Sequence, residues 1–367
     1  MKMRVAMVFP TRESEKAISG YSIYLVKALN KNKVDSDSIT YTAGSPMTLF
    51  KNFKYFKKYD IIHIQHEYNL LGWYSLPFFI LYPLLSLSGC KVITTMHTTL
   101  SQKEKLKGNV IKTFLRRLLY FIQNRVINWF SDIVIVHAYF FKDILSKEYG
   151  FSKGKIKVLP QGIIEDTKVI PQKEAKKKIR ISGNAYLIIG NFVPDHGADI
   201  ILKQAGKIGK TILIVANPKA INDRNQKRLT NYLDSCIKYV RDKGFSKYVR
   251  FDTKPINDEK PLWWNYFAAA DLVLQPYRGG IGSGIFTHAM STKTPVVASN
   301  IKFFEEISER YGCIKVADKE EDYPKIIKEV MKPKNYAKMK KECVRYAKEN
   351  SWNEVAKKYK KIYSTLN

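Results

Sequence analysis

The 367-residue chain has few cysteines and little at its start that would direct it for export. Cys90, Cys236, Cys313 and Cys343 are far apart, and no two form a CxxC pair. This spacing excludes a disulfide framework and a zinc site of the paired-cysteine type, and it indicates reduced thiols in a cytoplasmic protein. The opening MKMRVAMVFP meets Pro10 too soon for a signal peptide, so it predicts a strand instead.

Acidic residues are also scarce, with 33 Asp and Glu against 63 Lys and Arg, a formal net charge of +30. Such an excess favours an anionic partner: nucleic acid, a negatively charged membrane or a phosphorylated substrate. The alternative is that the lysines only cover solvated faces. Because no nucleic-acid-binding motif is present, we expect no nucleic acid partner.

Charged residues are missing altogether between Glu67 and Lys91. The core of this segment, LLGWYSLPFFILYPLLSLSG, is long enough for a membrane span. Pro77 and Pro83 interrupt it, however, and strand-like runs, DIIHIQ and KVITTM, flank it. The pattern favours a helix at 74–88 that is buried against a sheet or dips into a membrane, with a true span as the less favoured alternative.

Short apolar runs alternate with helical stretches along most of the chain, which predicts parallel sheets covered on both faces. The front half has strand-like runs MRVAMVF, DIIHIQ, KVITTM, DIVIVH and KIKVLP, with helices expected near 20–30, 74–88, 107–130 and 139–149. After a polar, lysine-rich segment from Glu165 to Ser182, expected to be a linker, the runs are YLIIGNF, TILIVA, YVRFDT, DLVLQP, PVVASN and CIKVA. We therefore expect an α/β protein with two doubly wound, Rossmann-like domains, followed by two basic helices at about 334–365.

The loop PYRGGIGSG at 276–284 follows the strand-like run DLVLQ and precedes a helix that starts near Ser283. Ligands of doubly wound sheets bind beyond the carboxyl ends of the strands. A glycine-rich helix start offers unpaired amides and a positive dipole end to a phosphate. A plain strand-to-helix turn is the alternative for this loop.

Several of these stretches together resemble glycosyltransferase family 4. The resemblance rests on QHEYNLLG and TMHTT in the first half and on PYR…SG…AM…PVVAS in the second, and it covers nearly the whole chain. It implies a GT-B fold, in which two Rossmann-like domains face each other across a cleft. The implied domains are 1–165, on the acceptor side and joined by the terminal helix 352–367, and 166–351, which binds the nucleotide-sugar.

The resemblance also implies roles for individual residues. Gly20 matches the second glycine of the family's Gly-Gly loop at the first helix, where the backbone approaches the donor phosphates; a plain helix start is the alternative. His97 matches a histidine that contacts the transferred sugar, although a packed histidine is the alternative. Glu67 would accept hydrogen bonds from sugar hydroxyls, and Ser283 and Gly284 match the phosphate-binding helix start.

Two departures from the family pattern bear on the donor. Of the usual pair of glutamates in Glu-x7-Glu, the first is replaced by Gly280 and the second, which holds the ribose, by His288. The Arg and Lys phosphate clamp is replaced by Asn191 and His196 in GNFVPDHG. We expect His288 to bind the ribose through a ring nitrogen and Arg278 to supply the lost positive charge.

The resulting prediction is a retaining, metal-independent hexosyltransferase without a cofactor, which moves a sugar from a nucleotide-sugar to a glycan or a lipid-linked acceptor. The alternative is a catalytically inactive GT-B protein that binds nucleotide-sugar or partners an active transferase. In IKTFLRRLLYFIQNRVINWF, Arg116, Arg117 and Arg125 alternate with large apolar residues, which predicts contact with an anionic membrane. An ordinary domain helix with snorkelling arginines is the alternative. We expect a cytoplasmic protein at the inner face of the cell membrane.

Overall fold

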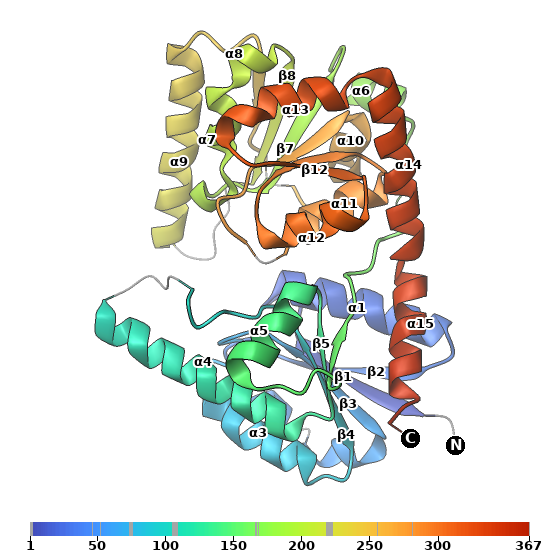
Figure 1. The fold of residues 1–367 in the computed structure, drawn as a ribbon. Coiled ribbons are helices and arrows are strands. Elements are labelled where there is room, and N and C mark those ends of the chain that lie inside the picture. Colours follow the sequence, from blue (N-terminus) through green and yellow to red (C-terminus); the bar gives the residue numbers. More distant parts are fainter. Residues whose placement is uncertain are drawn as a thin grey trace. The chain divides into compact units, whose positions relative to one another are not determined.

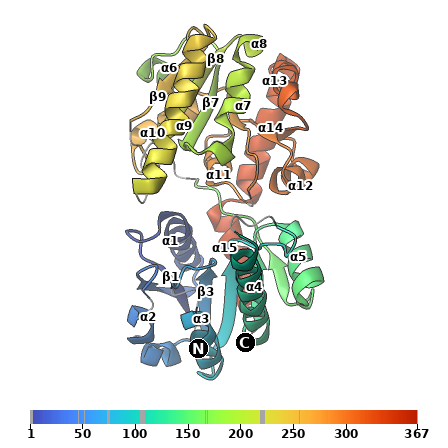
Figure 2. The same cartoon turned by 90° about the vertical axis from the view of Figure 1, so that its left-hand side faces the viewer.

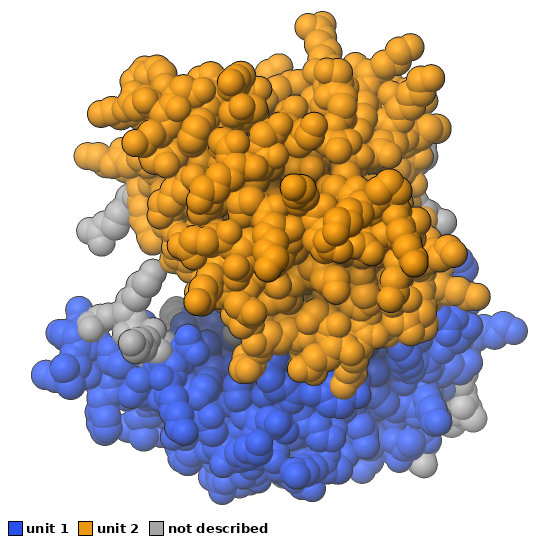
Figure 3. All heavy atoms as spheres, turned by 45° about the horizontal axis from the view of Figure 1, so that its top comes forward, with its two compact units in different colours: residues 1–162, 350–367 blue, residues 163–349 orange. Residues whose placement is uncertain are grey.

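The computed structural model describes residues 3–45, 47–51, 53–72, 76–104, 109–165, 167, 169–217, 223–254, 256–280 and 282–366. The chain forms two compact units, unit 1 with residues 1–162 and 350–367 and unit 2 with residues 163–349 (Figure 3). The sequence-based division was 1–165 with 352–367, and 166–351. Parts of four predicted segments lie outside the described residues. These are 74 and 75 of the helix 74–88, 107 and 108 of the helix 107–130, 166 and 168 of the lysine-rich segment, and Ile281 of the glycine-rich loop.

Unit 1 is a six-stranded parallel sheet in the order β2-β1-β3-β4-β5-β6, with helices around it (Figure 1). Its elements are β1 (Arg4–Pro10), α1 (Lys16–Lys31), β2 (Asp35–Tyr41), α2 (Met47–Lys51), the 3-10 helix η1 (Phe53–Lys58), β3 (Ile61–His66), α3 (Leu76–Ser86), β4 (Lys91–Met96), α4 (Val110–Phe130), β5 (Ile133–Val136), α5 (Tyr139–Tyr149), β6 (Ile156–Val158) and α15 (Trp352–Tyr363). Every residue of β3 is buried, as expected for a central strand covered on both faces.

The order of the strands determines which helices share a face of this sheet. From β1 the chain moves outward to β2, and from β3 onward it moves in the opposite direction. Right-handed connections therefore put α1 on one face and α3, α4 and α5 on the other. The packing agrees, because α1 packs with α15, whereas α4 packs with both α3 and α5.

Unit 2 repeats the design with the order β12-β11-β10-β7-β8-β9, again all parallel, and helices flank its sheet as well (Figures 1 and 2). Its elements are α6 (Gln172–Lys178), β7 (Ala185–Asn191), η3 (Pro194–His196), α7 (Ala198–Lys203), α8 (Ala205–Ile208), β8 (Thr211–Asn217), α9 (Asp223–Asp242), β9 (Val249–Asp252), α10 (Pro261–Ala269), β10 (Leu272–Gln275), α11 (Gly284–Ser291), β11 (Val296–Ser299), α12 (Lys302–Arg310), β12 (Ile314–Ala317), η4 (Glu320–Asp322), α13 (Tyr323–Val330) and α14 (Pro333–Glu349). The prediction of two doubly wound parallel sheets is confirmed.

Two sequence-based expectations about local structure were wrong. The strand β2, DSDSITY, was missed because it is a polar edge strand without an apolar run. The segment from Glu165 to Ser182 is not only a linker, because it contains α6, which packs against α10. Lys176 of α6 forms a 2.8 Å ion pair with Asp271, just before β10.

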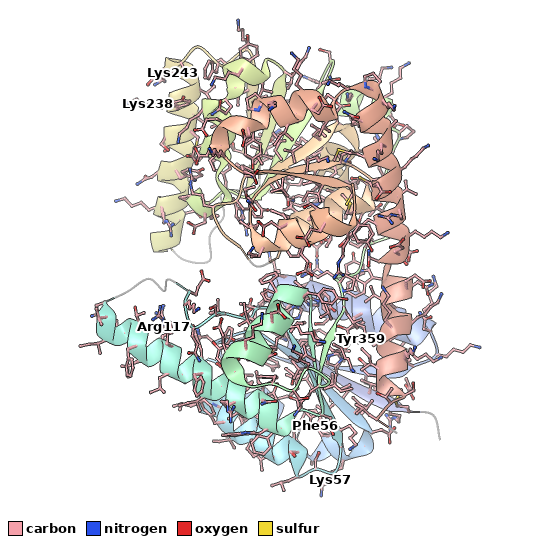
Figure 4. All side chains as sticks on the ribbon, in the orientation of Figure 1. Phe56, Lys57, Arg117, Lys238, Lys243 and Tyr359 are labelled. Atoms are coloured by element: carbon pink, nitrogen blue, oxygen red, sulfur yellow. The ribbon has the colours of Figure 1, made fainter. Side chains whose placement is uncertain are left out.

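The last helix, α15, is held to unit 1 by aromatic and polar contacts. Tyr359, labelled in Figure 4, shares a 2.8 Å hydrogen bond between its hydroxyl and that of Tyr21 in α1. The hydroxyl of Tyr363 lies 2.6 Å from Nδ1 of His63 in β3. Trp352, at the start of the helix, packs against the ring of Tyr21 with 5.0 Å between centroids.

Candidate functional site

The carboxyl edge of the second sheet is where unit 2 is best suited to bind a ligand. The strand order changes direction between β7 and β10, and such switch points open a crevice at the carboxyl ends of the two strands. The segment 191–197 leaves β7 there, and the loop 276–283 leaves β10 there. The two segments touch, since the amide of Arg278 donates a 2.9 Å hydrogen bond to the carbonyl of Asp195.

The loop from β10 ends at Ser283, which caps α11 as the sequence predicted. Its hydroxyl accepts a 3.1 Å hydrogen bond from the amide of Phe286. Within the described residues, no hydrogen bond is made by the amides of Gly284 and Ile285, the first two of the helix. A Cβ at Gly284 would meet nothing within 4 Å, and Gly284 is exposed, so the start of the helix is open to a ligand. This is the geometry of an anion site at a helix end.

His288 lies one turn into α11, partly buried against the aromatic residues of α10. The indole of Trp263 donates a 3.1 Å hydrogen bond to Nδ1 of His288. Burial lowers the pKa of His288 to about 4, against a smaller opposing effect of Asp258. The ring is therefore neutral at pH 7, and because Nδ1 accepts, its proton resides on Nε2. His288 thus presents a donor where a glutamate would present acceptors.

The Nδ1 atom of His196 donates a hydrogen bond, whereas that of His288 accepts one. The hydrogen bond from His196 is 2.6 Å long and goes to the carbonyl of Asn191, and the ring of His196 stacks on Tyr277 with 4.6 Å between centroids. Burial lowers the pKa of His196, although the Asn191 carbonyl and Asp195 oppose this shift. In the neutral ring Nε2 carries a lone pair, so His196 binds a phosphate oxygen only after it takes up a proton. The side chain of Asn191 is exposed.

Arg278 makes contacts that the sequence did not predict. Its guanidinium forms two hydrogen bonds to the carboxylate of Asp199, at 2.8 and 2.6 Å, and a third to the carbonyl of Pro194 at 2.7 Å. Burial would raise the pKa of Asp199, but the hydrogen bonds of Arg278 and Tyr232 outweigh it and lower the pKa. Asp199 therefore stays ionised and offsets the charge of Arg278, which braces the two loops against each other.

In unit 1, Glu67 and His97 both lie at the carboxyl edge of the sheet, after β3 and β4. Glu67 accepts hydrogen bonds from the hydroxyl of Thr98 and, at 2.9 Å, from the amide of Tyr68. Burial raises the pKa of Glu67, while these two hydrogen bonds lower it. The carboxylate links the residues that follow the two strands. Its remaining lone pairs can accept a hydrogen bond from a hydroxyl of a ligand.

His97 lies beside His137, a residue that the sequence analysis did not select. Nε2 of His97 donates to Oε1 of Gln65 at 2.9 Å, and Nδ1 of His137 donates to the carbonyl of Leu159 at 2.9 Å. The other nitrogens of the two rings face each other at 3.4 Å. Burial lowers the pKa of both rings, to about 4 for His137. The edge of Tyr21 packs on His97, so both orientation and protonation of this ring are fixed by its neighbours.

The expectation that Gly20 lies in a loop before the first helix was wrong. Gly20 is the fifth residue of α1, whose start is capped by Glu15. The carboxylate of Glu15 accepts from the amides of Ala17, Ile18 and Ser19, so the protein itself supplies the anion at this helix end. A Cβ at Gly20 would meet only Nη1 of Arg12, at 4.0 Å.

The sequence analysis missed four residues, each of which contacts a predicted residue or caps the helix that contains one. They are Glu15, His137, Asp199 and Trp263. His137 had a usable signal, because it follows the apolar strand IVIV just as His97 follows KVITTM. Among the described residues, no group of three or more His, Cys, Asp or Glu side chains is arranged to hold a metal ion.

Comparison with known proteins bears on this arrangement. Residues 5–167 match the family model for Glycosyltransferase Family 4. The resemblance stated from the sequence is confirmed for this part of the chain. No curated protein matches the chain.

Solved structures extend the likeness to both units of the chain. A glycosyltransferase from Rickettsia africae has 15% identity and a TM-score of 0.71, with 100% of this chain and 98% of that chain covered. Anabaena Alr3699/HepE in complex with UDP has 13% identity and a TM-score of 0.73, with 99% and 100% covered. Sucrose-phosphate synthase from Thermosynechococcus elongatus has 15% identity and a TM-score of 0.72, with 99% of each chain covered. The GT-B fold predicted from the sequence is confirmed.

Proposed function

We propose that this protein is a glycosyltransferase that transfers a sugar from a nucleotide-sugar, and that unit 2 binds the donor. The observation that supports this most is the start of α11, which is open to a ligand beside a capping Ser283 at the switch point of the second sheet. Anabaena Alr3699/HepE, of the same fold, was solved in complex with UDP and with UDP-glucose. We assign the diphosphate to this helix end and the ribose to Nε2 of His288.

The proposed chemistry is electrostatic and uses no metal. The bond between the anomeric carbon and the leaving phosphate breaks, a bond to an acceptor hydroxyl forms on the same face, and the hydroxyl proton passes to the phosphate. Negative charge grows on the phosphate in the transition state, where the amides of Gly284 and Ile285 and the helix dipole stabilise it. Glu67 and His97 are proposed to contact the sugar and the acceptor, and Arg278 to hold the donor loop in shape.

A second function is favoured by the residues around this loop. Gly280 offers no side chain in place of a glutamate, Asn191 and neutral His196 replace two cations, and the charge of Arg278 is offset by Asp199. Losing one donor to the developing charge typically costs on the order of 3 kcal/mol in the transition state. The second candidate is therefore an inactive protein that binds the nucleotide-sugar without turning it over.

Thermal unfolding with a panel of nucleoside diphosphates and nucleotide-sugars, with and without EDTA, tests the donor site. A nucleotide at about 100 times its Kd stabilises the protein by about 2.7 kcal/mol, which raises Tm by roughly 5–11 °C for a unit of this size. If no nucleotide raises Tm, the donor site is refuted. Hydrolysis or transfer of the stabilising donor separates the enzyme from the inactive protein, and the configuration of the product tests retention.

A further inference from the structure

The helix α3 exposes a row of apolar side chains to solvent. Leu76, Ile80, Leu84 and Leu87 follow one another at spacings of four, four and three residues, so they lie on one face of the helix and its end. Leu87 is 84% exposed and Ile80 is 59% exposed. The opposite face, with Phe78 and Tyr82 among others, is buried against the sheet. The helix is therefore apolar on both faces, and only one of them belongs to the core.

The helix α4 also exposes many apolar side chains. Its buried residues are Tyr120, Gln123, Asn124, Val126 and Ile127, and the hydroxyl of Tyr68 donates a hydrogen bond to Oδ1 of Asn124. Most of its other large apolar residues face outward. The exposed ones are Val110, Ile111, Phe114, Leu115, Leu118, Phe121, Ile122 and Trp129. Ile111 is 70% exposed and Phe114 is 63% exposed, whereas a surface helix normally turns such residues to the core.

The cations of α4 flank this apolar face. At about 100° per residue, Lys112 falls on one side of it and Arg117 on the other, whereas Arg116 lies further round the helix. Arg117, labelled in Figure 4, donates to the carbonyl of Glu104 with its head group at the surface. Arg125 lies over the ring of Trp129, 5.4 Å from its centroid. Neither α3 nor α4 contains an acidic residue.

The two helices form one surface, because α3 and α4 pack against each other on the same face of unit 1 (Figure 1). We call their exposed apolar residues and the flanking cations of α4 the α3/α4 face. Contiguous apolar patches of this kind are rare on monomeric soluble proteins and mark sites of interaction. No helix in the described part of the chain has the length and hydropathy needed to cross a membrane.

We propose that the α3/α4 face binds the surface of an anionic phospholipid bilayer. A broad apolar face with flanking cations and no acid is what a helix lying in the headgroup region requires, since leucines and aromatic rings enter the acyl boundary while the arginines meet lipid phosphates. A second copy of the chain fits less well. A two-fold contact through this face would bring Lys112 and Arg117 of both copies together without any acid to pair with.

The inference has a consequence for the acceptor, and that consequence rests on the proposed function. A unit 1 held on a bilayer works on acceptors presented at the membrane surface, such as a glycan on a lipid carrier. The binding itself needs neither donor nor acceptor. A test with vesicles alone therefore distinguishes failure of the α3/α4 face from failure of the donor site.

The experiment is co-sedimentation of the whole protein with vesicles of phosphatidylcholine alone and of equal parts phosphatidylcholine and phosphatidylglycerol. We expect binding to the anionic vesicles only, with release as salt shortens the screening length to about 3 Å near 1 M. The charge variant is Lys112→Gln with Arg117→Gln. Because each cation near such a surface contributes about fivefold to partitioning, we expect a loss of about 25-fold.

The apolar variant is Phe114→Ser with Leu118→Ser, for which we expect a loss of about 100-fold or more, since each buried side chain of this size is worth about tenfold or more. Each variant has a matched control on unit 2. Lys238→Gln with Lys243→Gln removes two exposed lysines, one in α9 and one just after it, both labelled in Figure 4. Ile237→Ser with Val344→Ser removes two exposed apolar side chains. Both controls should bind like the parent protein.

Three results would overturn the proposal. The first is equal binding of the parent to neutral and anionic vesicles, or binding to neither. The second is an equal loss in the α4 variants and in their unit 2 controls, which would make the effect one of total charge or hydropathy. The third is a dimer in sedimentation velocity that Phe114→Ser with Leu118→Ser converts to a monomer, because the face would then be covered by a second copy.

Discussion

Replacement of Gly162 by alanine should detach the last helix from unit 1. A Cβ at this position would lie 2.2 Å from Cδ2 and 2.5 Å from Cε2 and Cε3 of Trp352. These atoms belong to a rigid indole that is 8% exposed and packed against Tyr21, so they have little room to move. Overpacking of a core costs about 1–3 kcal/mol, and complete expulsion of a buried Trp costs about 3–5 kcal/mol.

The assay is urea unfolding followed by far-UV circular dichroism, with near-UV dichroism to report on the environment of Trp352. We expect a loss of about 1–5 kcal/mol, which lowers the Tm of a unit of this size by roughly 2–4 °C for each kcal/mol. The matched control is Gly154→Ala, where a Cβ would meet only Oγ of Ser152, at 3.8 Å. This control should be unchanged or slightly more stable.

A double-mutant cycle makes the test specific to the indole. In a Trp352→Leu background the ring is gone, so Gly162→Ala should cost much less than in the parent. The reasoning is refuted if Gly162→Ala unfolds at the same urea concentration as Gly154→Ala. It is equally refuted if its cost is the same with and without Trp352.

Four further outcomes are expected. Gly284→Val should abolish nucleotide binding, measured by calorimetry, and change Tm little, because a Cβ there meets no protein atom within 4 Å; parent-like binding would place the donor elsewhere. His288→Ala should weaken nucleotide binding by one hydrogen bond, about 0.5–1.5 kcal/mol. Burial lowers the pKa of His196, so nucleotide affinity should rise as pH falls below about 6.5, where His196 gains the proton that it needs to meet a phosphate, and His196→Gln should remove this dependence. Burial lowers the pKa of His63 and His66 to about 3. As pH falls, these histidines therefore take up protons in the unfolded chain before they do so in the folded protein, and stability to urea should fall from about pH 6.5 toward pH 3. A flat profile would contradict the burial of the two rings.

The strands were predictable from the sequence because they are central and apolar. Runs such as IIHIQH and KVITTM are buried on both faces, and their hydropathy follows directly from that position. β2 was not predictable in this way. At the edge of the sheet it is stabilised by backbone pairing with β1 and by the side chain of Asn30, which bonds to the backbone of Ser36 on both sides, and neither contact leaves an apolar pattern.

The orientation of α4 about its axis shows which information the periodicity of a sequence does not contain. The sequence predicted an amphipathic helix with arginines among apolar residues, and the helix spans Val110–Phe130. Periodicity does not tell which face is buried. Asn124 turns inward, where its Oδ1 accepts a hydrogen bond from the hydroxyl of Tyr68, and many apolar residues of the helix lie outward. The expected surface therefore depends on contacts from a distant part of the chain.

For the candidate site, too, the sequence predicted where the residues lie but not which hydrogen bonds they make. The pattern of strands and glycines placed Glu67 and His97 at one sheet edge and Ser283 and Gly284 at the other. It did not reveal their hydrogen bonds. Whether a histidine donates or accepts depends on its partner, which is Trp263 for His288 and the Asn191 carbonyl for His196. Trp263 was outside the motifs that the sequence offered, and Asn191 was inside one but was expected to act through its side chain.

Arg278 is the residue for which this difference matters most. A cation next to a glycine-rich loop suggests direct contact with a phosphate, but Asp199 holds the guanidinium through two hydrogen bonds and stays ionised. A phosphate would have to compete with that carboxylate, so positive charge near the donor comes mainly from the amides at the start of α11. Those amides act only if the loop keeps its shape, and the shape depends on the bonds from Arg278 to Pro194 and Asp199. In our proposal the arginine therefore supports the donor site through geometry, and a diphosphate meets oriented dipoles at the positions where the family 4 pattern has an Arg and a Lys.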